Sequence, residues 1–286
     1  MSPRLHSIAA ALDWGTSVLA ALNTVDEPRV ETQRLLAAAL AITRTELLAR
    51  DATALDESQA SRFSGFVQRR ANGEPFAYIV GTRDFWTLSL HVTPAVLVPR
   101  PETELLVERA LHLGGGRRLV TVLDLGTGSG CVALALGTER ADWRITATDR
   151  CSDALAVAKA NAARLSICNV EFIHSDWFSQ IPQRRFDLIA SNPPYIGAAE
   201  PALSRADLRF EPRDALSPGA DGLAALRTLC EQAAQHLKRE GWLMLEHGID
   251  QSTAVRGMLV AQGFAHVTSH RDLAGIERVT EAQWRG

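Results

Sequence analysis

The sequence lacks the features of secreted, membrane-spanning and disulfide-rich proteins. No uninterrupted apolar run among its 286 residues is long enough to cross a bilayer. The first residues are not followed by the apolar core and cleavage site of a secretory signal. Only four cysteines are present, and no two of them form a Cys-x-x-Cys pair. These absences predict reduced thiols in a cytoplasmic protein, with no membrane partner, no disulfide framework and no metal site.

An excess of basic charge is also missing. The 30 Lys and Arg residues are balanced by 33 Asp and Glu residues, and the formal net charge is -3. This balance argues against a protein whose main partner is bulk nucleic acid, although a local basic patch is compatible with it. We find no internal repeat and no low-complexity segment. What is present, 46% hydrophobic and 22% charged residues, is typical of a globular protein with one large domain or a large and a small one.

Residues 1–73 are predicted to form a small helical domain. From residue 4 to about residue 72, apolar residues such as Leu5, Ile8 and Leu12 recur at helical spacing. No strand pattern interrupts them. The domain is interpreted either as a stabilising cap or as a docking domain for a substrate.

Residues 74–98 are predicted to form a β-hairpin that links two domains. Gly73-Glu74-Pro75 breaks the helical pattern. The segments after it are rich in strand-forming residues, and we expect three strand segments, Phe76–Val80, Gly81–Trp86 and Leu88–Val92.

Residues 99–286 are predicted to form an α/β domain. Strand and helix patterns alternate from Leu119 onward, which favours a parallel sheet covered by helices. The expected strands are residues 119–125, 144–148, 170–173, 186–190 and 242–246, with two last strands at 265–269 and 277–280.

A glycine-rich turn follows the first of these strands. The segment Gly126-Thr127-Gly128-Ser129-Gly130 leads into a helix, and Asp149 ends the next strand. Glycines allow a ligand to approach the backbone closely, and a carboxylate at that position accepts hydrogen bonds from two ribose hydroxyls. The glycine spacing differs from that of a dinucleotide site. A surface helix cap is the structural alternative for Asp149.

Asp176 and Trp177 follow the third strand of the α/β domain. Trp177 is suited to stack on a planar base, and Asp176 is suited to accept from the amino group of that base. Each residue alone is more often structural. Both lie at the carboxyl end of a strand, where ligands of α/β sheets bind.

Two prolines end the fourth strand of the domain. Because Pro193 and Pro194 lack an N–H group, the sheet ladder stops there. The side-chain oxygen of Asn192 and the carbonyl of Pro193 are then two acceptors on a stiff frame, which matches the two hydrogens of an –NH2 group. Tyr195 is placed to pack on the planar group that carries this –NH2. A Pro-Pro turn that only ends a strand is the structural alternative.

The motif Asn192-Pro193-Pro194-Tyr195 resembles the signature of methyltransferases that act on planar amino groups, and Asp124–Gly130 resembles the first motif of S-adenosylmethionine-dependent methyltransferases. Further blocks extend the resemblance, from end to end, to the peptide chain release factor glutamine N5-methyltransferases. These blocks are Gly73–Pro75, Phe85-Trp86, Val98–Glu104, Asp176–Phe178, Phe210–Pro212, Leu245–Gly248, Arg271–Leu273 and Glu277–Val279.

This resemblance implies a Rossmann-like class I methyltransferase sheet with a small N-terminal helical domain. It implies S-adenosylmethionine as the cofactor, bound by Gly126, Thr127, Gly128, Ser129, Gly130, Asp149, Asp176, Trp177 and Asn192. The implied substrate is the glutamine of the Gly-Gly-Gln tip of class I release factors, with no stable nucleic-acid partner. The implied catalytic residues are Asn192, Pro193 and Tyr195, and the same residues bind the substrate together with Pro194.

Two other functions are compatible with parts of the pattern. A DNA adenine-N6 methyltransferase presents the same acceptors to a flipped base, but it needs a basic groove and a long target-recognition insert. A binding protein that has kept the fold and lost the chemistry is the other alternative, and the intact Asn192 and glycine loop argue against it. Arg100 and Glu246 are compatible both with site residues and with buried structural ions.

Overall fold

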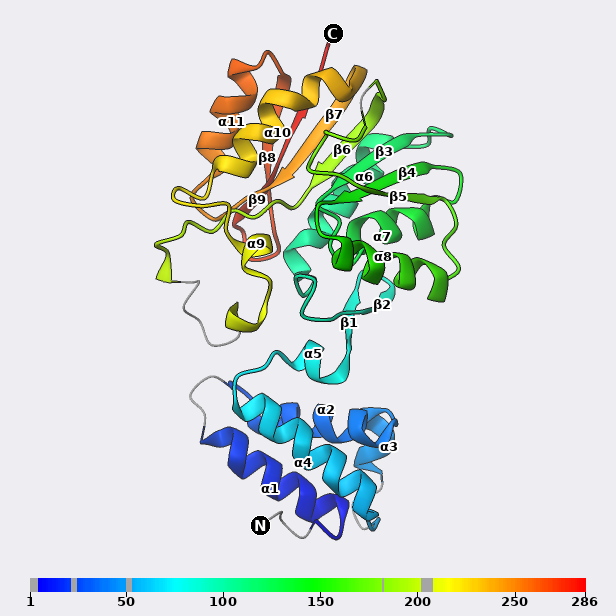
Figure 1. The fold of residues 1–286 in the computed structure, drawn as a ribbon, viewed down its shortest axis with the longest axis vertical. Helices are drawn as coiled ribbons and strands as arrows, with labels where there is room; N and C mark the ends of the chain where they lie inside the picture. The colour runs from blue at the N-terminus through cyan, green and yellow to red at the C-terminus, as the bar shows by residue number, and fades with distance from the viewer. Residues whose placement is uncertain (1–4, 22–24, 50–52, 182, 202–207) are drawn as a thin grey trace. The chain divides into compact units, whose positions relative to one another are not determined.

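The computed structural model describes residues 5–21, 25–49, 53–181, 183–201 and 208–286. They divide into two compact units (Figure 1). The described residues up to Gly81 form a helical unit together with the short 3-10 helix η3 (Leu208–Phe210), and the other described residues from Thr82 onward form a unit built on a sheet. Residue 4, where we expected the helical region to begin, lies outside the described residues. The division into 1–73, 74–98 and 99–286 stays a prediction.

Three helices of 13–15 residues and two of five residues build the described part of the helical unit. Side chains such as Leu12, Leu35 and Phe63 are fully buried in its single core. Thr43 and Asp56 each cap the helix that follows, with a reciprocal bond from the third helical residue. The helices are α1 (Ile8–Ala20), α2 (Pro28–Leu40), α3 (Arg44–Leu48), α4 (Glu57–Ala71) and α5 (Phe76–Val80).

The segment Phe76–Val80 is a helix, so the strand predicted there is wrong. Its aromatic and β-branched residues favour a strand by propensity, but Ile79 packs into the core of the helical unit. The guanidinium of Arg69 also donates to the carbonyl of Tyr78, at 3.2 Å. Gly81, in the left-handed conformation at a φ of 79°, ends the helix. Tertiary packing therefore overrides the local preference.

The other unit contains a two-stranded hairpin and a seven-stranded sheet. The sheet order is β5-β4-β3-β6-β7-β9-β8. Its first five strands are parallel, and β9 runs antiparallel to both of its neighbours. The predicted parallel α/β sheet is therefore confirmed, with an antiparallel edge added. The strands are β1 (Thr82–Phe85) and β2 (Leu88–His91) in the hairpin, and β3 (Thr121–Leu125), β4 (Arg144–Asp149), β5 (Val170–His174), β6 (Phe186–Ser191), β7 (Leu237–Glu246), β8 (Ala265–Arg271) and β9 (Glu277–Gln283) in the sheet.

Helices cover both faces of the sheet, with α7 and α8 on one side and α10 and α11 on the other (Figure 1). Successive strand residues alternate between the two cores: Val122 and Leu188 are buried in one, and Leu123 and Ile189 in the other. Over the described residues, no helix is both long and apolar enough to cross a bilayer. The helices of this unit are η1 (Pro101–Thr103), α6 (Glu104–Gly114), α7 (Cys131–Glu139), α8 (Ser152–Arg164), α9 (Arg213–Leu216), α10 (Ala224–Gln232), η4 (Ala233–His236) and α11 (Ser252–Ala261).

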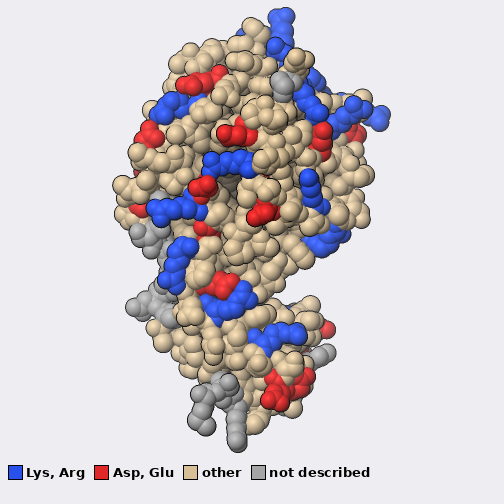
Figure 2. Space-filling model, viewed as in Figure 1, with Lys and Arg blue, Asp and Glu red and all other residues tan. Residues whose placement is uncertain are grey.

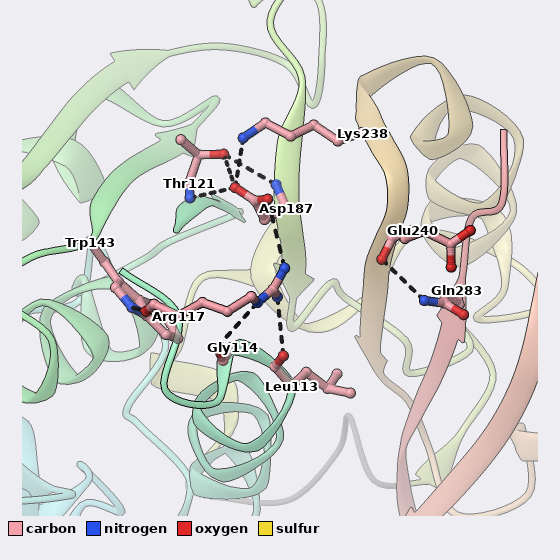
Figure 3. Close-up of polar contacts among 9 residues, drawn as sticks. All are labelled: Leu113, Gly114, Arg117, Thr121, Trp143, Asp187, Lys238, Glu240 and Gln283. Carbon is pink, nitrogen blue, oxygen red and sulfur yellow. Dashed lines mark hydrogen bonds and ion pairs between the residues drawn. The ribbon is translucent and has the colours of Figure 1, made fainter. Parts of the chain in front are cut away.

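One carboxylate joins the amino-terminal ends of three adjacent strands (Figure 3). Asp187 of β6 accepts from the backbone N–H of Thr121 at 2.8 Å and from its hydroxyl at 2.7 Å. The ammonium group of Lys238 in β7 donates to the same carboxylate at 2.7 Å. Partial burial alone would raise the pKa of Asp187, but the hydrogen bonds from Lys238 and Thr121 outweigh it and lower that pKa.

We expect Asp187→Asn to lower the free energy of unfolding at pH 7 by about 1–2 kcal/mol. A carboxylate whose pKa is lower in the folded state stabilises fully above its unfolded pKa of about 3.9, and this contribution is lost as the pH falls through the folded pKa. The difference in the free energy of unfolding between the wild type and the variant should therefore become smaller in acid, as measured by urea unfolding between pH 7 and pH 3. Glu171→Gln, at an exposed ion pair with Arg184, is the control and should change little. A deficit that is the same at every pH would contradict the assignment.

Candidate functional site

A cavity of about 1070 Å³ lies at the carboxyl ends of the parallel strands of the sheet unit. Because β4 and β6 flank β3 on opposite sides, the strand order reverses here, and such a reversal is where open α/β sheets bind ligands. The cavity brings together most of the residues singled out from the sequence: Gly126, Thr127, Gly128, Ser129, Asp149, Asp176, Trp177, Asn192 and Pro194.

The glycine loop is held by backbone hydrogen bonds to the end of β4. The N–H groups of Gly126 and Thr127 both donate to the carbonyl of Thr148, each at 2.9 Å. Gly130 precedes α7 with a φ of 86°, and a Cβ on it would lie 2.9 Å from Leu134 Cδ1. A side chain is thus excluded at Gly130 by both conformation and space, and the loop stays open toward the cavity.

Asp149, at the end of β4, holds this loop in place by a hydrogen bond. Its Oδ2 accepts from the N–H of Gly128 and its Oδ1 from the N–H of Cys151, both at 2.9 Å. A carboxylate has about four acceptor sites, so further capacity remains for hydroxyl groups of a ligand in the cavity. The bond to Cys151 is a local turn at the start of α8, and the bond to Gly128 reaches across to the loop. Asp149 is therefore more than a helix cap.

A second acid under the loop was missed in the sequence analysis. Asp124 is buried at the end of β3, and its Oδ2 accepts from the hydroxyl of Thr127 at 2.6 Å and from the N–H of Ala133 at 3.2 Å. Burial raises the pKa of Asp124 to about 6, against the opposing effect of these two hydrogen bonds. The position of Asp124 directly before the glycine loop was the feature of the sequence from which its contact with the loop could have been predicted.

Asp176 and Trp177 lie on the same wall of the cavity, in the turn after β5. The hydroxyl of Ser175 donates to the carbonyl of Trp177 at 2.7 Å, which holds the turn. A Cβ on Gly126 would lie 3.6 Å from Cζ3 of Trp177, so the indole ring lies beside the glycine loop. The wall thus combines an aromatic face with an exposed carboxylate.

The segment after β6 presents two hydrogen-bond acceptors. The hydroxyl of Ser191 donates to the carbonyl of Leu125 at 2.8 Å and holds the end of β6 against β3. The side-chain nitrogen of Asn192 donates to Thr103 Oγ1 at 3.0 Å. Among the described residues, no donor occupies Asn192 Oδ1 or the carbonyl of Pro193. The structure therefore leaves both acceptors available.

Three of the residues singled out from the sequence do not line the cavity: Gly130, Pro193 and Tyr195. Pro193 is buried. The hydroxyl of Tyr195 donates to Glu246 Oε1 at 3.2 Å, and its ring packs against the core on one face of the sheet. Burial raises the pKa of the Tyr195 hydroxyl, so it stays protonated and can donate this bond.

The structure also places Arg100 and Glu246, whose roles the sequence left open. Arg100 lines the cavity and forms an ion pair with Glu211, which also accepts from the N–H of Val98 at 3.0 Å. Glu246 is buried at the end of β7. Glu211 and Thr103 belong to sequence blocks noted above, but nothing in their spacing showed which residues they contact.

Within the described ranges, no group of three or more His, Cys, Asp or Glu side chains is arranged to hold a metal ion.

Comparison with known proteins gives matches over both units. A family model described as the PrmC N-terminal domain matches residues 10–81, and one described as the methyltransferase small domain matches residues 102–206. A release factor glutamine methyltransferase of Pseudomonas aeruginosa is 50% identical over 90% of this chain and 92% of its own length. The protein of the same description from Escherichia coli is 41% identical over 93% of this chain and 96% of its own length.

The fold is also found in solved structures. The 16S rRNA N2 G1207 methyltransferase of T. thermophilus is 20% identical, and the match covers 71% of this chain and 50% of that chain with a TM-score of 0.53. At this identity the likeness concerns the fold alone.

We expect Gly130→Ala to lower the free energy of unfolding by about 1–2 kcal/mol, because the new methyl group adds both a strained φ and a clash with Leu134. Gly257→Ala is the matched control. Gly257 lies in α11 of the same unit with open space around it, so this change should be neutral or stabilising by up to about 1 kcal/mol. Urea unfolding followed by circular dichroism measures both variants. Equal stability of the two would show that the loop tolerates a side chain at Gly130.

Proposed function

The chain belongs to the family of release factor glutamine methyltransferases, and we propose that it transfers the methyl group of S-adenosylmethionine to the side-chain amide nitrogen (N5) of the glutamine in the Gly-Gly-Gln motif of class I peptide chain release factors. Identities of 41–50% run through both units of the chain. The observation that carries the proposal is that Asn192 lines the glycine-loop cavity and no donor among the described residues occupies its Oδ1. The carbonyl of Pro193, the next residue, also has no donor among them.

The residues of the cavity fit S-adenosylmethionine. The glycine loop offers close backbone approach, and Asp149 keeps acceptor capacity for the ribose hydroxyls. Trp177 offers a face for the adenine ring, and Asp176 offers an acceptor for its amino group. We assign Gly126, Thr127, Gly128, Ser129 and Asn192 to the same site. Gly130 does not line the cavity, and its positive φ and close packing against Leu134 maintain the conformation of the loop. When bound, S-adenosylmethionine supplies a methyl group on a positively charged sulfur.

The work of the protein is to orient a poor nucleophile. The lone pair of an amide nitrogen is delocalised, so its attack requires a fixed geometry. Asn192 Oδ1 and the Pro193 carbonyl each accept one amide hydrogen, and they hold the nitrogen while it becomes pyramidal. The two prolines keep these acceptors rigid. Alignment of this kind contributes roughly 7–11 kcal/mol in well-oriented reactions. No general base is assigned, because a nitrogen that has gained a fourth bond loses its proton readily to water.

Tyr195 and Pro194 complete the proposed substrate site. We expect the ring of Tyr195 to pack on the flat amide when a glutamine enters. Its hydroxyl, bonded to Glu246, restricts where that ring lies. Pro194 lines the cavity next to Asn192 and limits the space beside the amide.

The protein partner is a class I release factor, and we propose that residues 1–73 help to dock it. We further propose a cytoplasmic location and no stable nucleic-acid partner. On the face of the sheet unit drawn in Figure 2, Lys and Arg side chains are interspersed with Asp and Glu. This mixture does not favour DNA adenine methylation, the alternative weighed from the sequence, because a flipped-base enzyme needs a basic groove.

The first experiment measures methyl transfer from labelled S-adenosylmethionine to a purified class I release factor. We expect one added methyl group on the Gly-Gly-Gln glutamine, identified by mass spectrometry of the modified peptide. Duplex DNA that contains adenine serves as the parallel substrate and should stay unlabelled. Label in the DNA and none in the protein would refute the proposed substrate.

Asn192→Ala separates catalysis from binding. Loss of one acceptor leaves the amide nitrogen misaligned, so we expect kcat to fall about 100-fold or more, as for the loss of one oxyanion-hole donor. The affinity for S-adenosylmethionine, measured by calorimetry, should change far less. Asp149→Ala should show the reverse pattern, with weakened binding as its main effect. An equal loss of turnover and affinity in Asn192→Ala would refute the role of Asn192 as the amide acceptor.

A further inference from the structure

One arginine of the cavity is oriented by a buried carboxylate. Arg100 lines the cavity, and its Nη2 donates to Oε1 of Glu211. The side chain of Glu211 is 1% exposed, and that of Arg100 is 31% exposed. Glu211 Oε2 also accepts from the backbone N–H of Val98 at 3.0 Å. Glu211 is therefore held by the backbone, and it holds the guanidinium of Arg100 at the cavity wall.

The guanidinium of Arg100 keeps donors that the chain does not use. Arginine has five N–H groups in a planar fork and stays positively charged in proteins. Glu211 accepts from Nη2, and among the described residues no acceptor is bonded to Nε or Nη1 of Arg100. An oriented arginine with unused donors at a cavity wall is suited to bind a second carboxylate by charge-assisted hydrogen bonds.

Arg100 lies on the same side of the cavity as the Asn192 segment. The backbone N–H of Thr103 donates to the carbonyl of Arg100 at 3.1 Å, so both residues belong to one turn at η1. Thr103 Oγ1 in turn accepts from the side-chain nitrogen of Asn192 at 3.0 Å. Arg100 is thus one turn of chain away from a residue that contacts the proposed acceptor of the substrate amide.

Two other arginines of the described residues line the cavity, and neither is held by a buried acid. Arg150 directly follows Asp149, the residue proposed to bind the ribose, and forms an ion pair with exposed Asp214 at 2.8 Å. Arg213 is exposed in α9, and no carboxylate of the described residues pairs with it. Arg100 is therefore the arginine whose position at the cavity is fixed.

The proposed cofactor site follows the strand order β5-β4-β3-β6. The adenine ring is assigned to the turn after β5 and the ribose to Asp149 at the end of β4, while the methyl group must face Asn192 after β6. In S-adenosylmethionine the ribose, the methyl group and the methionine chain are all joined through one sulfur atom. The methionine chain therefore begins beyond the ribose, toward the Asn192 segment, and Arg100 lies on that side.

We propose that Arg100, oriented by Glu211, binds the carboxylate of the methionine part of S-adenosylmethionine. This inference rests on the proposed function and deepens it, because it adds a subsite for the amino-acid end of the cofactor. A carboxylate on the release factor has the same chemistry. Cofactor binding measured without the release factor separates these two sources.

Calorimetry with two ligands tests the subsite in the full chain. Decarboxylated S-adenosylmethionine lacks only the carboxylate, so the wild type should bind S-adenosylmethionine about 10- to 100-fold more tightly than this analogue. In Arg100→Met, this preference should fall to about threefold or less. Methylthioadenosine lacks the whole amino-acid end, so its affinities for the wild type and for Arg100→Met should agree within about threefold.

The double variant Arg100→Met with Glu211→Gln separates the lost contact from a folding defect. Loss of Arg100 alone leaves the carboxylate of Glu211 buried and unpaired, which is destabilising. Glutamine removes that charge and keeps an acceptor for the N–H of Val98. The double variant should show the same loss of preference as Arg100→Met, and thermal unfolding reports its stability separately.

Arg150→Met and Arg213→Met are the matched controls, since each removes one positive charge from the same cavity. Their preference for S-adenosylmethionine over the decarboxylated analogue should stay within about threefold of that of the wild type. A loss of preference as large as that in Arg100→Met would show a general effect of charge and would overturn the assignment to Arg100.

Equal affinity of the wild type for the two ligands, or an unchanged preference in Arg100→Met, would overturn the proposal. If the preference is unchanged and the KM for the release factor rises, the carboxylate bound by Arg100 belongs to the release factor and the cofactor subsite is refuted. Wild-type protein that methylates no release factor would instead refute the proposed function. The binding measurements need no release factor, so the two failures are distinguishable.

Discussion

The parallel alignment of β3 with both β4 and β6 is the constraint on which the rest of the site depends. Because the three strands are parallel, their carboxyl ends lie at one edge of the sheet, and the chain continues from there into three different loops. This opens the cavity that the glycine loop, Asp149 and the Asn192 segment share. Side chains on both faces of the strands are buried under helices, so the edge cannot shift without disrupting two cores.

Carboxylates organise the loops at this edge by accepting hydrogen bonds from the backbone. Asp124 accepts from the start of α7, Asp149 from the glycine loop, and Glu211 from the segment before η1. Each carboxylate satisfies N–H groups that the ends of strands and helices leave without partners. Asp124 and Glu211 are buried and Asp149 is half-buried, and all three hold irregular backbone in place where no ladder of sheet bonds can reach. The cavity is therefore bounded by backbone that these three carboxylates hold in place.

The comparison of prediction with structure is most instructive where the two differ. Phe76–Val80 has the local preference of a strand but is a helix, because its apolar side chains complete the core of the helical unit. No partner for the Tyr195 hydroxyl could be predicted from the sequence, and the structure bonds it to Glu246, 51 positions away in the chain. Asp124 was part of a quoted motif, and its hydrogen bonds to Thr127 and Ala133 became visible only in the fold. The local sequence pattern does not show which distant residues will become neighbours, and such neighbours determine these contacts.

By itself the sequence determined the order along the chain of the strands in the α/β sheet, the glycine loop and the two prolines after β6. These features depend on local rules: hydrophobic periodicity, the conformational freedom of glycine and the missing N–H of proline. Only the tertiary structure decided which side chains face one another, such as Asn192 and Thr103, which lie 89 positions apart in the chain. The direction of a hydrogen bond depends on both of its partners and on their own neighbours. It is therefore fixed only when distant segments have packed together.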